Sequence, residues 1–209
     1  PAQGGQPAEP TGEARRRAPQ RLRALGRIVA LRDFADFAAG FPGVGKTAVN
    51  LLPGGKRLQL AVAPRDGRPL PADDPLLGQL AEAITAVRVA QTPRVTIRPF
   101  EPVPVTLGLA LFVETHLLAD EEAQRKVREA VIGRLLQEFG FAARELGQPL
   151  TEAELFKVVQ GVRGVTAVSI THLQAGQQAT ADGKRLTENE VRWYQLLQLS
   201  PAIDLEIRQ

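Results

Sequence analysis

The stretch that most constrains the fold of this chain is GFPGVGKT, Gly40–Thr47, taken together with its flanks. Its eight letters fit the phosphate-binding pattern G-x-x-x-x-G-K-[ST], in which backbone N–H groups and a lysine hold the phosphates of a nucleotide. That pattern works only where a buried strand enters the loop and a helix leaves it. The flanking sequence therefore decides between nucleotide binding and a structural role.

The flanks have the opposite order. An amphipathic helix before the motif is predicted by apolar residues at helical spacing, namely Leu31, Phe34, Phe37 and Ala38. After the motif, two short strands around the turn PGGK are predicted by alternating apolar residues, of which Leu58, Leu60 and Val62 are the clearest. The order helix–loop–strand argues against a nucleotide site. Phosphate binding by Gly40, Gly45, Lys46 and Thr47 remains the alternative hypothesis.

A second stretch, VVQGVRGVTAVSITHL, repeats the pattern of FAAGFPGVGKTAVNLL without its Gly-Lys pair. The matched positions are Gly40 with Gly161, Gly43 with Gly164, and Val44 with Val165. We expect the first glycine of each pair to end a helix with a positive φ. The second glycine then turns the chain so that the valine enters the core. In this interpretation the glycines have a structural role that needs no ligand.

The remaining patterns predict an α+β protein with two small sub-domains of short sheets packed with amphipathic helices, each containing a helix–Gly-Val–strand unit. Asp73 or Asp74 can cap a helix that has Pro75 in its first turn. The clearest strand lies in VPVTLGLALFVET, a charged helix starts at Asp120, and Thr151 with Glu154 forms a capping box. The predicted divisions are 1–24 (arm or linker), 25–99 and 100–175 (sub-domains), and 176–209 (extension with a terminal strand).

The net charge of +3 is unevenly placed. Residues 1–23 carry five arginines and two glutamates, so the rest of the chain has equal numbers of basic and acidic residues. A domain without net positive charge is a poor candidate for binding nucleic acid. The interface residues predicted from sequence are the arginine run and the only Trp and Tyr: Arg15, Arg16, Arg17, Trp193 and Tyr194. We expect the arm to be ordered by an acidic partner, and the terminal strand at Ile203–Ile207 to offer an edge to a neighbouring sheet.

No catalytic, metal-binding or cofactor-binding residues are expected. The chain has no cysteine and only two histidines, His116 and His172, far apart in sequence. Paired acids such as Glu121 and Glu122 suit the first turn of a helix. No run of apolar residues is long enough to span a bilayer, and no signal peptide is visible. The lack of methionine and the start at Pro1 favour a fragment of a longer protein.

Four stretches carry a resemblance: RDFADFAAGFPGVGKT, VTLGLALFV, REAVIGRLL and LTEAELFKVVQGVRGVTAV. Over residues 25–175 the chain resembles the baseplate J-like family, the wedge proteins of contractile phage tails and contractile injection systems. The resemblance implies a structural role with no reaction, cofactor or small-molecule substrate. It implies assembly in the cytoplasm into a phage tail-like particle, and no membrane or nucleic-acid partner.

The partners that the resemblance implies are other wedge subunits, including a second copy of the chain, and central hub or sheath-proximal proteins. Two alternatives remain beside this function. One is a P-loop nucleotide-binding protein, and the other is an oligomeric adaptor whose basic arm binds nucleic acid.

Overall fold

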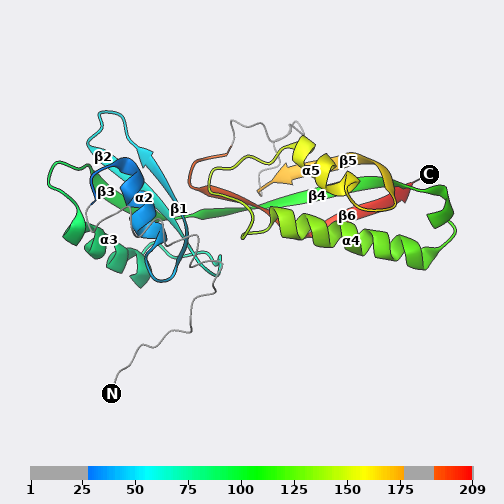
Figure 1. The fold of residues 1–209 in the computed structure, drawn as a ribbon, viewed down its shortest axis with the longest axis horizontal. Coiled ribbons are helices and arrows are strands. Elements are labelled where there is room, and N and C mark those ends of the chain that lie inside the picture. Colours follow the sequence, from blue (N-terminus) through cyan, green and yellow to red (C-terminus); the bar gives the residue numbers. More distant parts are fainter. Residues whose placement is uncertain (1–27, 177–190, 209) are drawn as a thin grey trace, which may run out of the picture. The chain divides into compact units, whose positions relative to one another are not determined.

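The computed structural model describes residues 28–176 and 191–208, which fall into two compact units (Figure 1). The first unit ends at Pro99 and the second begins at Phe100. The described residues contain four α-helices and two three-stranded sheets, each with one antiparallel and one parallel pair of strands. The predicted α+β class is confirmed.

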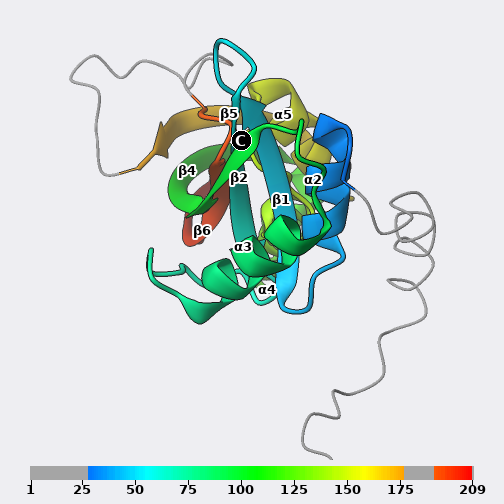
Figure 2. The same cartoon turned by 90° about the vertical axis from the view of Figure 1, so that its left-hand side faces the viewer.

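The first unit places β2 at the centre of its sheet, in the order β1-β2-β3 (Figure 2). β2 runs antiparallel to β1 and parallel to β3. Two helices complete the unit, one before the β1–β2 hairpin and one between β2 and β3. In chain order its elements are α2 (Leu31–Ala39), β1 (Val44–Leu51), β2 (Arg57–Pro64), α3 (Pro75–Val87) and β3 (Arg94–Pro99).

Both helices of the first unit cover the same face of the sheet. Phe34 of α2 and Leu80 of α3 are fully buried in one apolar cluster with Leu58 and Leu60 of β2. The start of α3 is fixed by Asp74, whose carboxylate accepts a hydrogen bond from the Leu76 N–H at 3.0 Å. The alternate residues of each strand point to the other face of this sheet.

The second unit has the same sheet arrangement, with β4 at the centre in the order β5-β4-β6. β4 is antiparallel to β5 and parallel to β6. The segment after Ala175 thus supplies a strand of this sheet. In chain order the elements are β4 (Glu101–Val113), a 3₁₀ turn (Thr115–Leu117), α4 (Glu121–Phe139), α5 (Glu152–Gln160), β5 (Val165–Ala175) and β6 (Gln195–Arg208).

The long central strand β4 tolerates two prolines because of where its neighbours begin. Pro102 and Pro104 pair with β6, whereas pairing with β5 starts only at Val105. A proline has no N–H to donate, so it suits a stretch with one partner strand. Beyond it, alternate residues of β4 enter a core formed with α4 and α5, including Val105, Leu107, Leu109, Leu111, Val131, Leu135 and Leu155.

The helix starts of the second unit follow the predicted chemistry. The Asp120 carboxylate accepts hydrogen bonds from the N–H groups of Glu122 and Ala123 at 3.0 and 3.1 Å. Thr151 and Glu154 form a reciprocal capping box at the start of α5. Both caps satisfy N–H groups that have no partner within the helix.

Candidate assembly surfaces

The GFPGVGKT motif lies between a helix and a strand, in the order helix–turn–strand. α2 ends at Ala39 and β1 begins at Val44, so Lys46 and Thr47 lie within a strand. The Thr47 hydroxyl donates to the carbonyl of Ala35 in α2 at 3.2 Å. Around the motif, the described residues therefore do not supply the strand–loop–helix that phosphate binding requires.

A close approach between backbones accounts for the motif's last glycine, Gly45. A Cβ atom at Gly45 would lie 2.7 Å from the Cα atom of Arg65 and 2.8 Å from the carbonyl oxygen of Pro64. The β1–β2 register shifts at this point, between Val44 and Lys46. A bulge pressed against the neighbouring strand thus requires a residue without a side chain.

The turns place the positive φ at the second glycine of each pair. Gly43 has φ of +87° and Gly164 has φ of +92°. We expected a positive φ also at Gly40 and Gly161, and that expectation is wrong, since their φ values are −80° and −72°. Each helix instead continues its right-handed turn through its first glycine, and the left-handed residue follows three positions later.

The two valines after these turns differ in depth. Val44 is fully buried in the core of the first unit. Val165 is half-buried and packs against the core of the second unit. Both therefore contact their core at the point where a strand begins.

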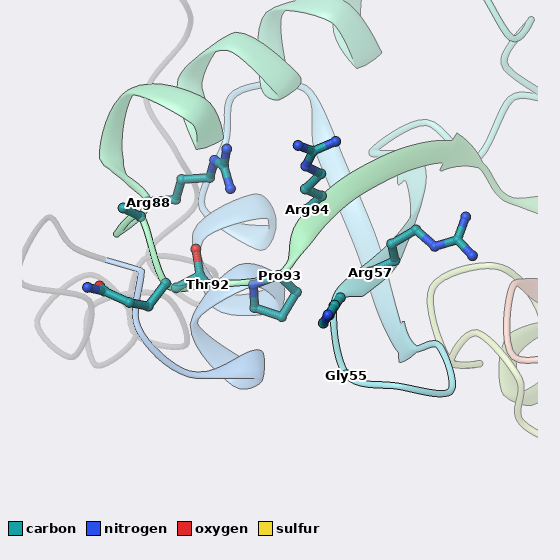
Figure 3. Close-up of a pocket in the computed structure, with 9 residues that line it drawn as sticks. Gly55, Arg57, Arg88, Thr92, Pro93 and Arg94 are labelled. Carbon is teal, nitrogen blue, oxygen red and sulfur yellow. The ribbon is translucent and has the colours of Figure 1, made fainter.

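A basic pocket lies at one end of the first unit's sheet, between the β1–β2 turn and the segment that follows α3 (Figure 3). Its volume is about 640 Å³. Four of its lining residues are cationic, and none is acidic. The lining comprises Gly55, Lys56, Arg57, Arg88, Ala90, Gln91, Thr92, Pro93 and Arg94.

The four cations of the basic pocket come from three different elements. Arg57 and Arg94 are register partners at the starts of β2 and β3, Lys56 precedes β2, and Arg88 follows α3. Figure 3 shows the Arg88 side chain reaching toward Arg94, while the guanidinium group of Arg57 turns away from both. Among the described residues, none of the four has an ion-pair partner within 4.0 Å. Sequence reasoning missed this pocket because its residues are spread from 55 to 94.

The edge strand β6 is a second exposed feature. Ile203, Leu205 and Ile207 pack against the core, and the acidic residues between them, Asp204 and Glu206, are exposed. β6 pairs with β4 along one side only among the described strands. Its alternation matches the predicted half-solvated strand.

Trp193 and Tyr194 lie just before β6, where they are tied into the second unit. Their rings meet edge to face at 5.5 Å, and the Tyr194 carbonyl accepts a hydrogen bond from the Glu101 N–H at 3.0 Å. The Tyr194 hydroxyl accepts from Arg192 at 2.8 Å, which raises the pKa of that guanidinium group. Tyr194 is buried and Trp193 is half-buried. Arg15, Arg16 and Arg17 lie outside the described residues.

The other sequence candidates have structural surroundings. His172 lies over the central strand, so that a Cβ at Gly108 would collide with its ring. Glu122 pairs with Arg125 on the surface of α4, and Glu154 belongs to its capping box. Within residues 28–176 and 191–208, no three His, Asp or Glu side chains are grouped so as to hold a metal ion. The same residues include no helix long and apolar enough to cross a membrane.

Comparison with known proteins gives two findings. Residues 26–97 match the family model of the Baseplate J-like central domain. The fold of the chain is similar to that of a chain in the cryo-EM structure of the anti-feeding prophage (AFP) baseplate, 6-fold symmetrised, with a TM-score of 0.61 and 18% sequence identity. No curated protein matches the sequence.

The fold match covers 94% of this chain but 43% of the baseplate chain, so this chain spans less than half the length of that relative. The two findings confirm the predicted resemblance to baseplate J-like proteins. The family model falls within the first unit, the one that contains GFPGVGKT and the basic pocket.

Proposed function

We propose that this protein is a structural wedge component of the baseplate of a contractile injection system or phage tail. One observation carries the proposal: a family match over the first unit coincides with a baseplate-like fold over nearly the whole chain. The role is one of assembly and not of catalysis. Its partners are other wedge subunits, a second copy included, and hub or sheath-proximal proteins, with which it assembles in the cytoplasm.

The surfaces of the two units suit such a role. Edge strands such as β6 can accept a further strand from a neighbour, with main-chain hydrogen bonds supplying affinity. Alternating acidic residues on such an edge discourage unspecific pairing and leave selection to a complementary partner. A subunit of a ring needs this kind of selective edge.

Deletion of the gene in the producing cell, complemented by a tagged copy, tests the proposal. We expect the deletion strain to yield no complete particles in electron micrographs. In complemented particles, we expect the density of the tag at the wedge positions of the baseplate. Complete particles from the deletion strain, or tag density confined to the tube or sheath, would contradict the wedge role.

A further inference from the structure

The sheet of the first unit has one apolar face and one basic face. Val95 and Ile97 of β3 pack on the helix-covered side, so Thr96 and Arg98 occupy the opposite side of the same strand. Arg94, at the start of the strand, lines a cavity with Ile84 and Thr85 of α3. The strands Val44–Leu51, Arg57–Pro64 and Arg94–Pro99 contain no Asp or Glu. Their basic residues are Lys46, Arg57, Arg94 and Arg98. The charged residues that these three strands contain are thus all cationic.

The basic pocket concentrates this charge at one end of the face. Arg57 and Arg94 are register partners on neighbouring parallel strands, so two like charges lie at the same end of the sheet. Lys56 and Arg88 add two more cations to the same cavity. Within residues 28–176 and 191–208, no carboxylate lines the pocket or pairs with its four cations. A ligand that carries several negative charges would remove the repulsion.

We propose that the basic pocket binds an acidic segment of a neighbouring baseplate subunit, one that presents two or more carboxylates. The identity of the partner as a baseplate subunit rests on the proposed function, whereas the acidic character of the segment follows from the pocket. Guanidinium groups bind carboxylates through paired hydrogen bonds. A cavity of about 640 Å³ has room for a short peptide segment.

The pocket is poorly suited to a nucleotide or a nucleic acid. The N–H groups of Gly55, Thr92 and Arg94 donate to carbonyls of the chain itself, those of Leu52, Val89 and Lys56, at 3.0–3.1 Å. They are therefore not offered to a phosphate, unlike the N–H groups of a phosphate-binding loop. The lining also has no aromatic side chain on which a base could stack. Only the side chains of this pocket can therefore bind a ligand, which suits carboxylates on a flexible segment.

A second copy of this chain is a less suitable occupant. The clearest exposed acids on an edge of the chain are Asp204 and Glu206 of β6. The Glu206 carboxylate already pairs with Arg208 at 2.7 Å. A different subunit with an acidic segment of its own therefore matches the pocket better than β6 of a second copy.

Fluorescence anisotropy with the purified chain tests the proposal. The probe is a labelled Gly-Ser peptide carrying glutamates, compared at low ionic strength with the same peptide carrying glutamines. We expect binding of the glutamate peptide alone. The variant Arg57→Gln/Arg94→Gln should weaken that binding on the order of tenfold, because it removes two of the four cations that line the pocket. The control Arg128→Gln/Arg134→Gln, on the exposed side of α4 in the second unit, should bind as the wild type does.

Three outcomes would overturn the proposal. The first is equal affinity of the two double variants for the glutamate peptide. The second is tight binding of an oligothymidylate of equal charge in place of the peptide, which would assign the pocket to nucleic acid. The third is self-association of the wild type in sedimentation velocity that Arg57→Gln/Arg94→Gln abolishes, which would make a second copy the occupant.

The pocket and the proposed function can fail separately. Tag density in the baseplate together with no peptide binding would remove the pocket proposal and leave the wedge role. Peptide binding with tag density elsewhere would do the reverse. A second pair, Lys56→Gln/Arg88→Gln, tests the same cavity and replaces the first pair if circular dichroism shows that variant to be unfolded.

Discussion

The turn that follows α2 and the turn that follows α5 share one hydrogen-bond pattern although they belong to different units. In the first, the Val44 N–H donates to the Phe41 carbonyl at 3.1 Å, and the Gly43 carbonyl accepts from the Arg65 N–H at 2.9 Å. In the second, the corresponding bonds are Val165 to Val162 at 3.2 Å and Glu114 to Gly164 at 3.1 Å. In both, the glycine carbonyl is held by the residue that follows the central strand.

The connections around these turns are different. In the first unit the central strand β2 follows the turn and strand β1, whereas in the second unit the central strand β4 precedes the turn. The parallel strand also enters differently, since β3 follows a crossover helix from β2 and β6 comes after β5. The same type of turn thus occurs in two different chain topologies. Its glycines are explained by the turn itself and require no common ligand.

The largest difference in stability loss between matched substitutions in the two units is expected near the starts of α5 and α2. Arg144 is 3% exposed, donates to Glu154 at 3.2 Å and to the carbonyls of Gln148 and Pro149, and lies over the Phe139 ring. We expect Arg144→Ala to lower the free energy of unfolding by about 3 kcal/mol, because it removes a buried guanidinium group together with its hydrogen bonds and its packing on Phe139. Chemical denaturation of the purified variant measures this loss.

The matched control for Arg144 is Asp33→Ala in the first unit. The exposed Asp33 carboxylate accepts from the N–H groups of Val29 and Ala30 at 2.9 and 2.7 Å, and its loss should cost about 1 kcal/mol. Equal losses in the two variants would show that the buried arginine is no more important than an ordinary cap.

The next effect concerns the second glycine of a turn. Gly164→Val should cost on the order of 1–3 kcal/mol, and we expect the upper part of that range. The reason is twofold, since φ is +92° and a Cβ would lie 2.8 Å from the Leu117 side chain. An unchanged denaturant midpoint for Gly164→Val would refute the assignment of strain to this turn.

A difference between the two turns appears one residue after the valines. Gly45 and Thr166 both lie where the register shifts. A Cβ atom at Gly45 would collide with backbone atoms, whereas Thr166 carries a side chain whose hydroxyl donates to the Phe112 carbonyl at 3.0 Å. Gly45→Ala should destabilise by about 1–2 kcal/mol through overpacking. Thr166→Ala should change stability by less than about 0.5 kcal/mol, as for an exposed residue. Similar thermal midpoints for the two variants would mean that the bulge at Gly45 relaxes easily.

A smaller effect, of opposite sign, is expected in the basic pocket. Arg57→Thr should raise the free energy of unfolding by about 0.5 kcal/mol, because it removes the like-charge pair with Arg94 and places a β-branched residue in a strand. The gain should shrink in high salt, since exposed charges are screened. A loss of stability in low salt would show that the Arg57 side chain makes a favourable contact in the native sheet.

The smallest effect is expected at Lys46, the lysine of the phosphate-binding pattern. Lys46→Ala should leave assembly intact and change stability by no more than about 0.5 kcal/mol. Isothermal titration with Mg-ATP should give no binding for the wild type or the variant. Micromolar binding that is lost in Lys46→Ala would restore the nucleotide hypothesis and separate the two turns in function.

The sequence predicted the elements well where the signal was local. Asp74, Asp120 and Thr151 cap their helices as the patterns indicated, because capping depends on residues within one turn. VPVTLGLALFVET was predicted to be a strand and forms β4, in which Val105, Leu107, Leu109 and Leu111 are buried. The glycine spacing predicted two turns, but it did not predict which glycine of each turn has the positive φ.

Contacts between distant residues were beyond the reach of sequence reasoning. The two repeated stretches also share the letters Thr-Ala-Val, at 47–49 and at 166–168, but these triplets do not lie at equivalent places. Lys46 and Ala167 are each the first paired residue after the register shift, so the triplets are displaced by two residues. Likewise, the basic pocket depends on the parallel pairing of β2 with β3, which no local pattern predicts. The burial of Arg144 depends on how the segment after α4 returns to α5.

The link between the two units has a mechanical consequence. β3 ends at Pro99 and β4 begins at Glu101, so a single residue, Phe100, joins two sheet strands. One residue extends by no more than about 3.6 Å, so the connection between the two strands is short. A pull on this linker therefore acts on the end of β3 in one unit and on the start of β4 in the other. The hydrogen-bond ladders of β3 with β2 and of β4 with β6 oppose that pull with several hydrogen bonds each.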